Sequence, residues 1–85
     1  MSTVAGFDIK IGGLHYRVKV EPDRSRGGYA AKLISVGVGV IMEPAGKTAE
    51  DALTQLAKEL RAGDATDRKI AKEIVRLAWF PLKLS

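Results

Sequence analysis

The sequence of 85 residues has the length of one small domain, which we expect to span residues 1–85. It contains no cysteine, so disulfides and thiolate metal sites are excluded, and its single histidine argues against a His-based metal site. The residues are 46% hydrophobic and 28% charged, and the formal net charge of +4 permits an anionic partner without requiring one.

The N-terminal half, from residue 3 to residue 43, has the two-residue period of β-strands. Polar and apolar residues alternate in FDIKI, and Gly12-Gly13 then favours a two-residue hairpin turn, because glycine tolerates the positive φ of such turns. LHYRVKVE continues the alternation, so we predict antiparallel strands with one packed face and one wet face. The packed face comprises Phe7, Ile9, Ile11, Leu14, Tyr16, Val18 and Val20.

A polar, glycine-ended loop, DRSRGG, precedes a third strand that we expect over residues 29–43. The alternation of this strand changes phase between Leu33 and Val36, which predicts a bulge or bend near Ser35. Alternating glycine and valine then leave one face of the strand without side chains. The apolar set on its other face comprises Val36, Val38, Val40 and Met42.

Residues 48–80 have a helical period. TAEDALTQLAKEL places apolar residues at spacings of three and four, with Thr48 as the N-terminal cap and Gly63 as the stop. The apolar stripe of this helix comprises Ala49, Ala52, Leu53, Leu56, Ala57 and Leu60.

A second helix is expected after Asp64 or Thr66 as its cap, and Pro81 ends it. Its inward residues are Ile70, Ile74, Leu77 and Ala78. The last residues, LKLS, form a tail or a short extra strand. The sequence therefore predicts an α+β fold of order β-β-β-α-α, in which a three-stranded antiparallel sheet carries two helices on one face.

Residues 46–48, GKT, match the end of a phosphate-binding P-loop between a valine-rich run and a helix. The loop would need a glycine where Ile41 stands, and Pro44 lacks one of the N–H groups that would cradle a phosphate. Glu50 and Asp51 would repel an anion at the same helix end. We therefore interpret these residues as a capped helix start, and we expect no nucleotide and no other cofactor.

Three segments together resemble the HicB family of antitoxins and its solo relatives. A strand of the type Y-x-V-x-V-E leads to G-G-Y-x-A, and G-x-T-x-E-E-A opens an amphipathic helix. The matching residues are Tyr16–Glu21, Gly27–Ala31 and Gly46–Ala52, within about half of the chain. The resemblance implies a small module that neutralises or sequesters another macromolecule and performs no chemistry. An inhibitor or accessory protein of a phage or other mobile element fits the same residues.

The valine-rich strand is the predicted interaction surface, because a three-stranded sheet would struggle to cover its apolar run. We expect a protein partner, or a second copy of the chain in a homodimer, to bind there by edge addition or face packing. The candidate interface residues are Val36, Val38, Val40, Met42 and Trp79; closing the core is the alternative role of Trp79-Phe80.

Nucleic-acid binding is the alternative function, from a different class. Two basic patches could contact phosphates, although acidic residues share the first and no aromatic pair there could stack bases. The patch on the wet sheet face comprises Lys10, His15, Arg17 and Lys19, and the stripe on the second helix comprises Arg68, Lys72 and Arg76. The alternative is that both patches are ordinary solvent-exposed faces without a ligand. A small-molecule pocket between sheet and helices has no signature in the sequence.

Catalysis is not expected. No pair of carboxylates is spaced as an acid/base couple, and His15 has no Ser, Asp or Glu placed to act with it. The longest apolar run, VGVGVIM, is far shorter than the roughly 20 residues of a membrane span. The N-terminus lacks the basic and apolar regions of a signal peptide. We therefore expect a cytoplasmic protein without a membrane partner.

Overall fold

The computed structural model describes residues 5–78 as an antiparallel sheet followed by two helices. The predicted α+β class is confirmed, but the sheet has more than the three expected strands. Its elements are β1 (Ala5–Ile11), β2 (Leu14–Pro22), β3 (Tyr29–Ser35), β4 (Gly39–Met42), β5 (Ala45–Gly46), α1 (Ala49–Arg61) and α2 (Ala65–Leu77).

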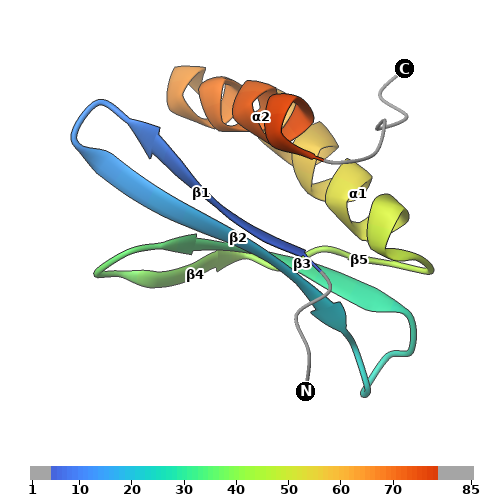
Figure 1. Ribbon diagram of the computed structural model, residues 1–85. Helices are drawn as coiled ribbons and strands as arrows, with labels where there is room; N and C mark the ends of the chain where they lie inside the picture. Colours follow the sequence, from blue (N-terminus) through green and yellow to red (C-terminus); the bar gives the residue numbers. More distant parts are fainter. Residues whose placement is uncertain (1–4, 79–85) are drawn as a thin grey trace.

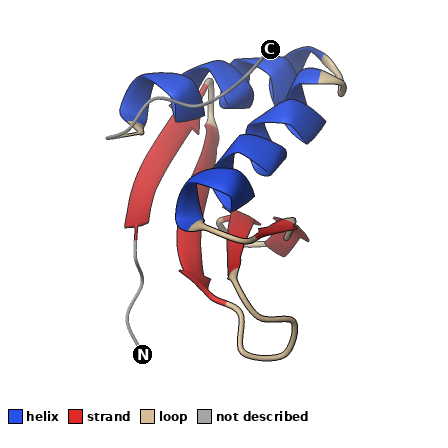
Figure 2. Cartoon of the chain, turned by 90° about the vertical axis from the view of Figure 1, so that its right-hand side faces the viewer, coloured by secondary structure: helices blue, strands red, loops and turns tan. Residues whose placement is uncertain are grey.

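The sheet has two different faces. Its strands run in the order β1-β2-β3-β4, and the short β5 pairs with β3 beyond the end of β4. Both helices lie over the same face of the sheet, as Figures 1 and 2 show. We call this the inner face; the outer face carries neither helix. The predicted placement of two helices on one face is therefore confirmed.

The β1–β2 hairpin turns at Gly12-Gly13, as predicted. Gly12 has a φ of +61° and Gly13 has no positive φ, which is the pattern of a type II′ turn with glycine first. The two-residue turn sets Ile11 opposite Leu14, and the same register brings Asp8 opposite Arg17. Leu14 itself, expected on the packed face, is 51% exposed and lies at the turn end of the hairpin.

The prediction of one long strand over residues 29–43 is wrong. The chain leaves β3 after Ser35, turns through residues 36–38 and returns as β4, so the expected bend is a complete reversal. Gly37 and Gly39 have φ values of +92° and +126°, which residues with a side chain rarely adopt. A bulge does occur, but on the returning strand, where Ile41 is left over as the pairing shifts between Leu33 and Ile34.

Both helices begin at the expected caps. The Thr48 hydroxyl accepts a hydrogen bond from the backbone N–H of Asp51 at 3.0 Å, and α1 ends at Arg61, two residues before Gly63. Asp64 caps α2 in a reciprocal capping box with Asp67. Pro81 and the LKLS segment lie outside the described residues.

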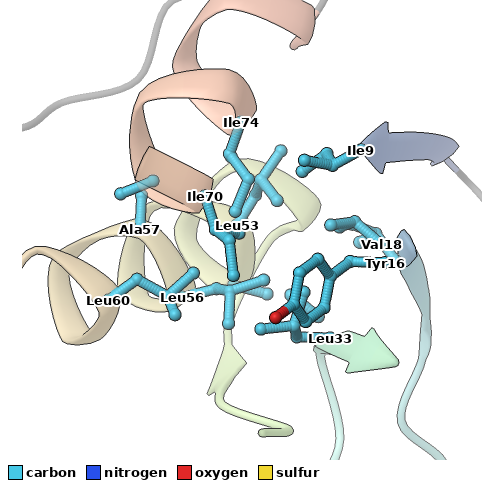
Figure 3. Packing of buried hydrophobic residues seen from close by; sticks show 14 residues of the cluster. Ile9, Tyr16, Val18, Leu33, Leu53, Leu56, Ala57, Leu60, Ile70 and Ile74 are labelled. Carbon is cyan, nitrogen blue, oxygen red and sulfur yellow. The ribbon is translucent and has the colours of Figure 1, made fainter. Parts of the chain in front are cut away.

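The core lies between the inner face and the helices, as Figure 3 shows from close by. The sheet contributes a patch of alternating residues, and the helices contribute their predicted stripes. Leu77 and Ala78 pack against this core and are half-buried. The fully or nearly fully buried residues of the cluster include Ile9, Val18, Val20, Leu33, Leu53, Leu56, Leu60, Ile70 and Ile74. The predicted inward faces of both helices are therefore confirmed.

Candidate functional site

The β3–β4 hairpin gathers most of the exposed hydrophobic side chains of residues 5–78. Within residues 5–78, six large hydrophobic residues are strongly exposed. Four of them belong to this hairpin, and a fifth, Leu14, lies beside it. The N–H of Val36 donates to the carbonyl of His15 at 3.0 Å, which fixes the turn next to the start of β2. We call this surface the apolar edge; it comprises Leu14, Val36, Val38, Val40 and Ile41.

The apolar edge contains most, but not all, of the predicted interface. Val36, Val38 and Val40 come together there, and Val38 at the tip is 84% exposed. Met42 does not belong to it, because it pairs with Leu33 and packs against the core from the inner face. Trp79 lies outside the described residues.

Two members of the apolar edge were missed by the sequence analysis. Ile41 is exposed because it is the extra residue of the bulge. The alternation of residues in the sequence did not indicate a bulge at this position. Leu14 could have been found, since a residue directly after a hairpin turn lies beyond the reach of the helices that cover the sheet.

The strand β4 is an uncovered border of the sheet. No strand of residues 5–78 pairs with its far side, so its outward N–H and C=O groups have no ladder partner there. Its sequence, GVIM, has no charged residue. The other border strand, β1, differs in both respects, because it carries Asp8 and Lys10 and α2 packs against it. The apolar edge is thus an unprotected border with hydrophobic side chains beside it.

Acids pair with some of the cations on the outer face. Arg17 Nε lies 3.0 Å from Asp8 Oδ1, and Lys32 Nζ lies 3.1 Å from Glu21 Oε1. The hydrogen bond from Arg17 lowers the pKa of Asp8, and the hydrogen bond with Glu21 raises the pKa of Lys32. The register confirms that the predicted cations lie on one face of the sheet, but acidic side chains on the same face pair with some of them.

His15 is a further member of this ion-paired group. Its Nε2 atom is 3.8 Å from Asp8 Oδ1, which is an ion-pair distance when the imidazole is protonated. The atom is shielded from solvent and has no hydrogen-bond partner among the described residues. Lys10 and Lys19 are the two predicted sheet cations that form no ion pair within residues 5–78.

A groove lies between the two helices, and cations line it. It is bounded by Arg61 near the end of α1 and by Arg68 and Lys72 on α2, with Ala71 and Val75 completing its lining. The Arg68 guanidinium donates through Nη1 to the Gly63 carbonyl at 2.8 Å. We call this surface the helix groove.

Arg76 does not share the helix groove, although the sequence placed it in one stripe with Arg68 and Lys72. Its Nη2 atom lies 2.6 Å from Glu73 Oε1. This hydrogen bond lowers the pKa of Glu73 and raises that of Arg76, so it favours the charged form of both side chains. Arg61 was missed, because its closeness to Arg68 depends on how the chain turns at residues 62–64.

The residues 46–48 form a helix start, as predicted. Thr48 uses its hydroxyl to cap α1, and Gly46 lies so close to the first turn that a Cβ atom there would meet the backbone N of Ala52. A hollow beside this turn is lined by Arg26–Gly28 and Ala45–Lys47. Within residues 5–78, no three His, Cys, Asp or Glu side chains gather as metal ligands do.

None of the helices within residues 5–78 has the length and apolar character needed to cross a membrane. A scan against models of known protein families and searches of curated proteins and of solved structures found no match to this chain.

Proposed function

We propose that this chain is a non-catalytic cytoplasmic binding protein that captures a protein partner through the apolar edge. The observation that carries the proposal is that four of the six exposed large hydrophobic residues within residues 5–78 belong to the β3–β4 hairpin at the border of the sheet, with Leu14 of β2 near its turn. Hydrophobic side chains scattered singly over a surface need no explanation, but a contiguous group is typical of interaction sites.

The border strand supplies the second element of recognition. An extended segment of a partner can hydrogen-bond to the outward backbone groups of β4, while its apolar side chains pack on Val38 and Val40. No charged residue of β4 opposes such pairing.

The partner in this proposal is a different protein rather than a second copy. β4 has only four residues, and its pairing with β3 is irregular at Ile41. Two such strands joined edge to edge would add few hydrogen bonds, whereas a stable interface needs about 800 Å² from each side. A partner that brings its own apolar surface meets this requirement more readily.

Neutralisation of a toxin is the specific form of capture that the HicB resemblance implies. The segments that carry the resemblance form β2, the approach to β3 and the start of α1. The tip of the β3–β4 hairpin, residues 36–38, does not belong to these segments, although Ser35 before it pairs with Tyr16. The proposal therefore places partner recognition on the part of the chain outside those segments, where a binding protein would carry its individual specificity.

The test uses a photo-crosslinking residue at position 38, with the same residue at position 75 as a control on the exposed surface of α2. The protein joined only through position 38 is identified, purified and titrated calorimetrically with the wild type, Val38→Lys and Val75→Lys. We expect saturable binding that Val38→Lys weakens at least tenfold, since burial of a valine contributes about 1.5–3 kcal/mol. Val75→Lys should bind as the wild type does.

Two results would overturn the proposal. The first is equal affinity of the purified partner for the wild type and for Val38→Lys. The second is a crosslink at position 38 that joins two copies of this chain, with sedimentation velocity giving a dimer that Val38→Lys converts to a monomer.

A further inference from the structure

We propose that the helix groove is a second binding site, which holds the phosphate backbone of a nucleic acid without reading its sequence. The site comprises Arg61, Arg68 and Lys72, with Val75 beside them. It is independent of the apolar edge, and it takes a ligand of a different chemical class.

The cations of the groove are not held in ion pairs by the described residues. Within residues 5–78, none of its three cations forms an ion pair. Arg68 uses one N–H to hold the Gly63 carbonyl and keeps its other donors, since a guanidinium has five. Arginine matches the geometry of a phosphate with paired N–H groups.

The outer sheet face is the weaker candidate for the same ligand. Arg17 and Lys32 are each held by an acid at about 3 Å, and a phosphate would have to displace a carboxylate to reach them. Within residues 5–78, no cation of the helix groove is held in an ion pair. Glu73, the nearest acid in the chain to Lys72, is already engaged by Arg76. In the described part of the chain, the outer face keeps two unpaired lysines, Lys10 and Lys19, whereas the helix groove offers two unpaired arginines, whose paired N–H groups match the geometry of a phosphate.

A nucleic acid fits this groove better than an acidic peptide does. A helical peptide in a groove needs several apolar anchors at spacings of three and four. The helix groove offers one exposed large hydrophobic residue, Val75, at 45% exposure. Phosphates need only cations and N–H donors, which the groove supplies from two elements. Binding through so few contacts is electrostatic and independent of base sequence.

The test is fluorescence anisotropy with random-sequence 20-nucleotide single-stranded DNA, RNA and duplex DNA at several salt concentrations. Three phosphate contacts predict a slope of log K against log salt of about −2 for single strands and about −2.7 for duplex. Between 50 and 200 mM salt, the affinity should therefore fall roughly 20-fold and 40-fold respectively.

A matched pair of double variants locates the site. Arg61→Gln with Lys72→Gln removes two cations from the helix groove, and Lys10→Gln with Lys19→Gln removes two from the outer face. The groove variant should lower the steepness of the salt slope by about 1.4 for single strands and about 1.8 for duplex, because two of the three phosphate contacts are lost. The sheet variant should keep the wild-type slope. Circular dichroism melts of both variants exclude unfolding as the cause.

Three results would overturn the inference. The first is that no nucleic acid binds at 50 mM salt. The second is that both double variants change the salt slope equally, which would mean that net charge rather than the groove causes the binding. The third is that poly-glutamate of matched length displaces the nucleic acid at an equal concentration, which would mean that the groove binds an acidic protein segment. Val38→Lys should leave nucleic-acid binding unchanged, which separates this site from the apolar edge.

Discussion

The carbonyl oxygen of Gly46 occupies the space that a Cβ atom on Gly28 would need. The backbone of β5 therefore passes directly against the end of the loop that leads into β3. Gly28 also has a φ of +71°, which side chains disfavour. Gly28→Ala should destabilise the protein by more than about 2 kcal/mol, because left-handed strain of roughly 1–2 kcal/mol adds to a clash with backbone. Urea denaturation measures this loss.

Gly27 provides the control for that prediction. Its φ of +78° is similar, but no atom lies within 4 Å of the position of its Cβ. Gly27→Ala should therefore cost only the left-handed strain, roughly 1 kcal/mol. Equal losses in the two variants would mean that β5 yields to the added methyl group and that the close approach contributes nothing.

The Thr48 hydroxyl should contribute to stability rather than to nucleotide binding. Thr48→Ala removes the acceptor for the Asp51 N–H and should cost about 1 kcal/mol in unfolding free energy. Thr48→Ser keeps the hydroxyl and should retain most of that stability. A serine variant as unstable as the alanine variant would assign the effect to the lost methyl group instead.

Asp23 should make the loop after β2 sensitive to acid. Hydrogen bonds from the Ser25 side chain and from Arg26 lower the pKa of Asp23 from 3.8 to about 2. Because the pKa is lower in the folded state, the ionised carboxylate stabilises the fold above about pH 4, and that contribution is lost as the pH falls through 2. The unfolding free energies of the wild type and Asp23→Asn should therefore converge between pH 4 and pH 2. A gap that stays constant over this range would contradict the assignment.

Substitutions at the apolar edge should affect binding without affecting folding. Val38, at 84% exposure, contributes little to the core, so Val38→Lys should change the unfolding free energy by less than about 0.5 kcal/mol. Leu33, on the preceding strand, is 1% exposed, and Leu33→Ala should cost about 2–5 kcal/mol. Thermal unfolding of the two variants checks the contrast. A large loss in Val38→Lys would mean that the turn holds the sheet together.

Local signals made much of the fold predictable. The Gly12-Gly13 turn determines the β1–β2 register, and with it the opposition of Asp8 and Arg17. The helices were found because their apolar stripes lie between clear caps, Thr48 and Asp64. In each case one short stretch of sequence contains all the information that the element needs.

The errors arose where neighbouring signals conflict. The run from Val36 to Met42 is rich in valine, which favours a strand, while Gly37 and Gly39 permit the turn that the chain adopts. The change of phase after Leu33 was a sign of this turn, but it also fits a bulge. The helix groove was harder to foresee, because Arg61 and Arg68 meet only through the packing of α1 on α2.

The strand order of the sheet has a consequence for how the protein folds. Each strand from β1 to β4 pairs with the next one along the chain, so every pairing closes a short loop at small entropic cost and the sheet should form quickly. Among residues 5–78, however, the helices that cover its inner face come from residues after 48. A chain that has formed only its sheet therefore exposes an apolar inner face to water, and that face is covered only when α1 and α2 pack on it.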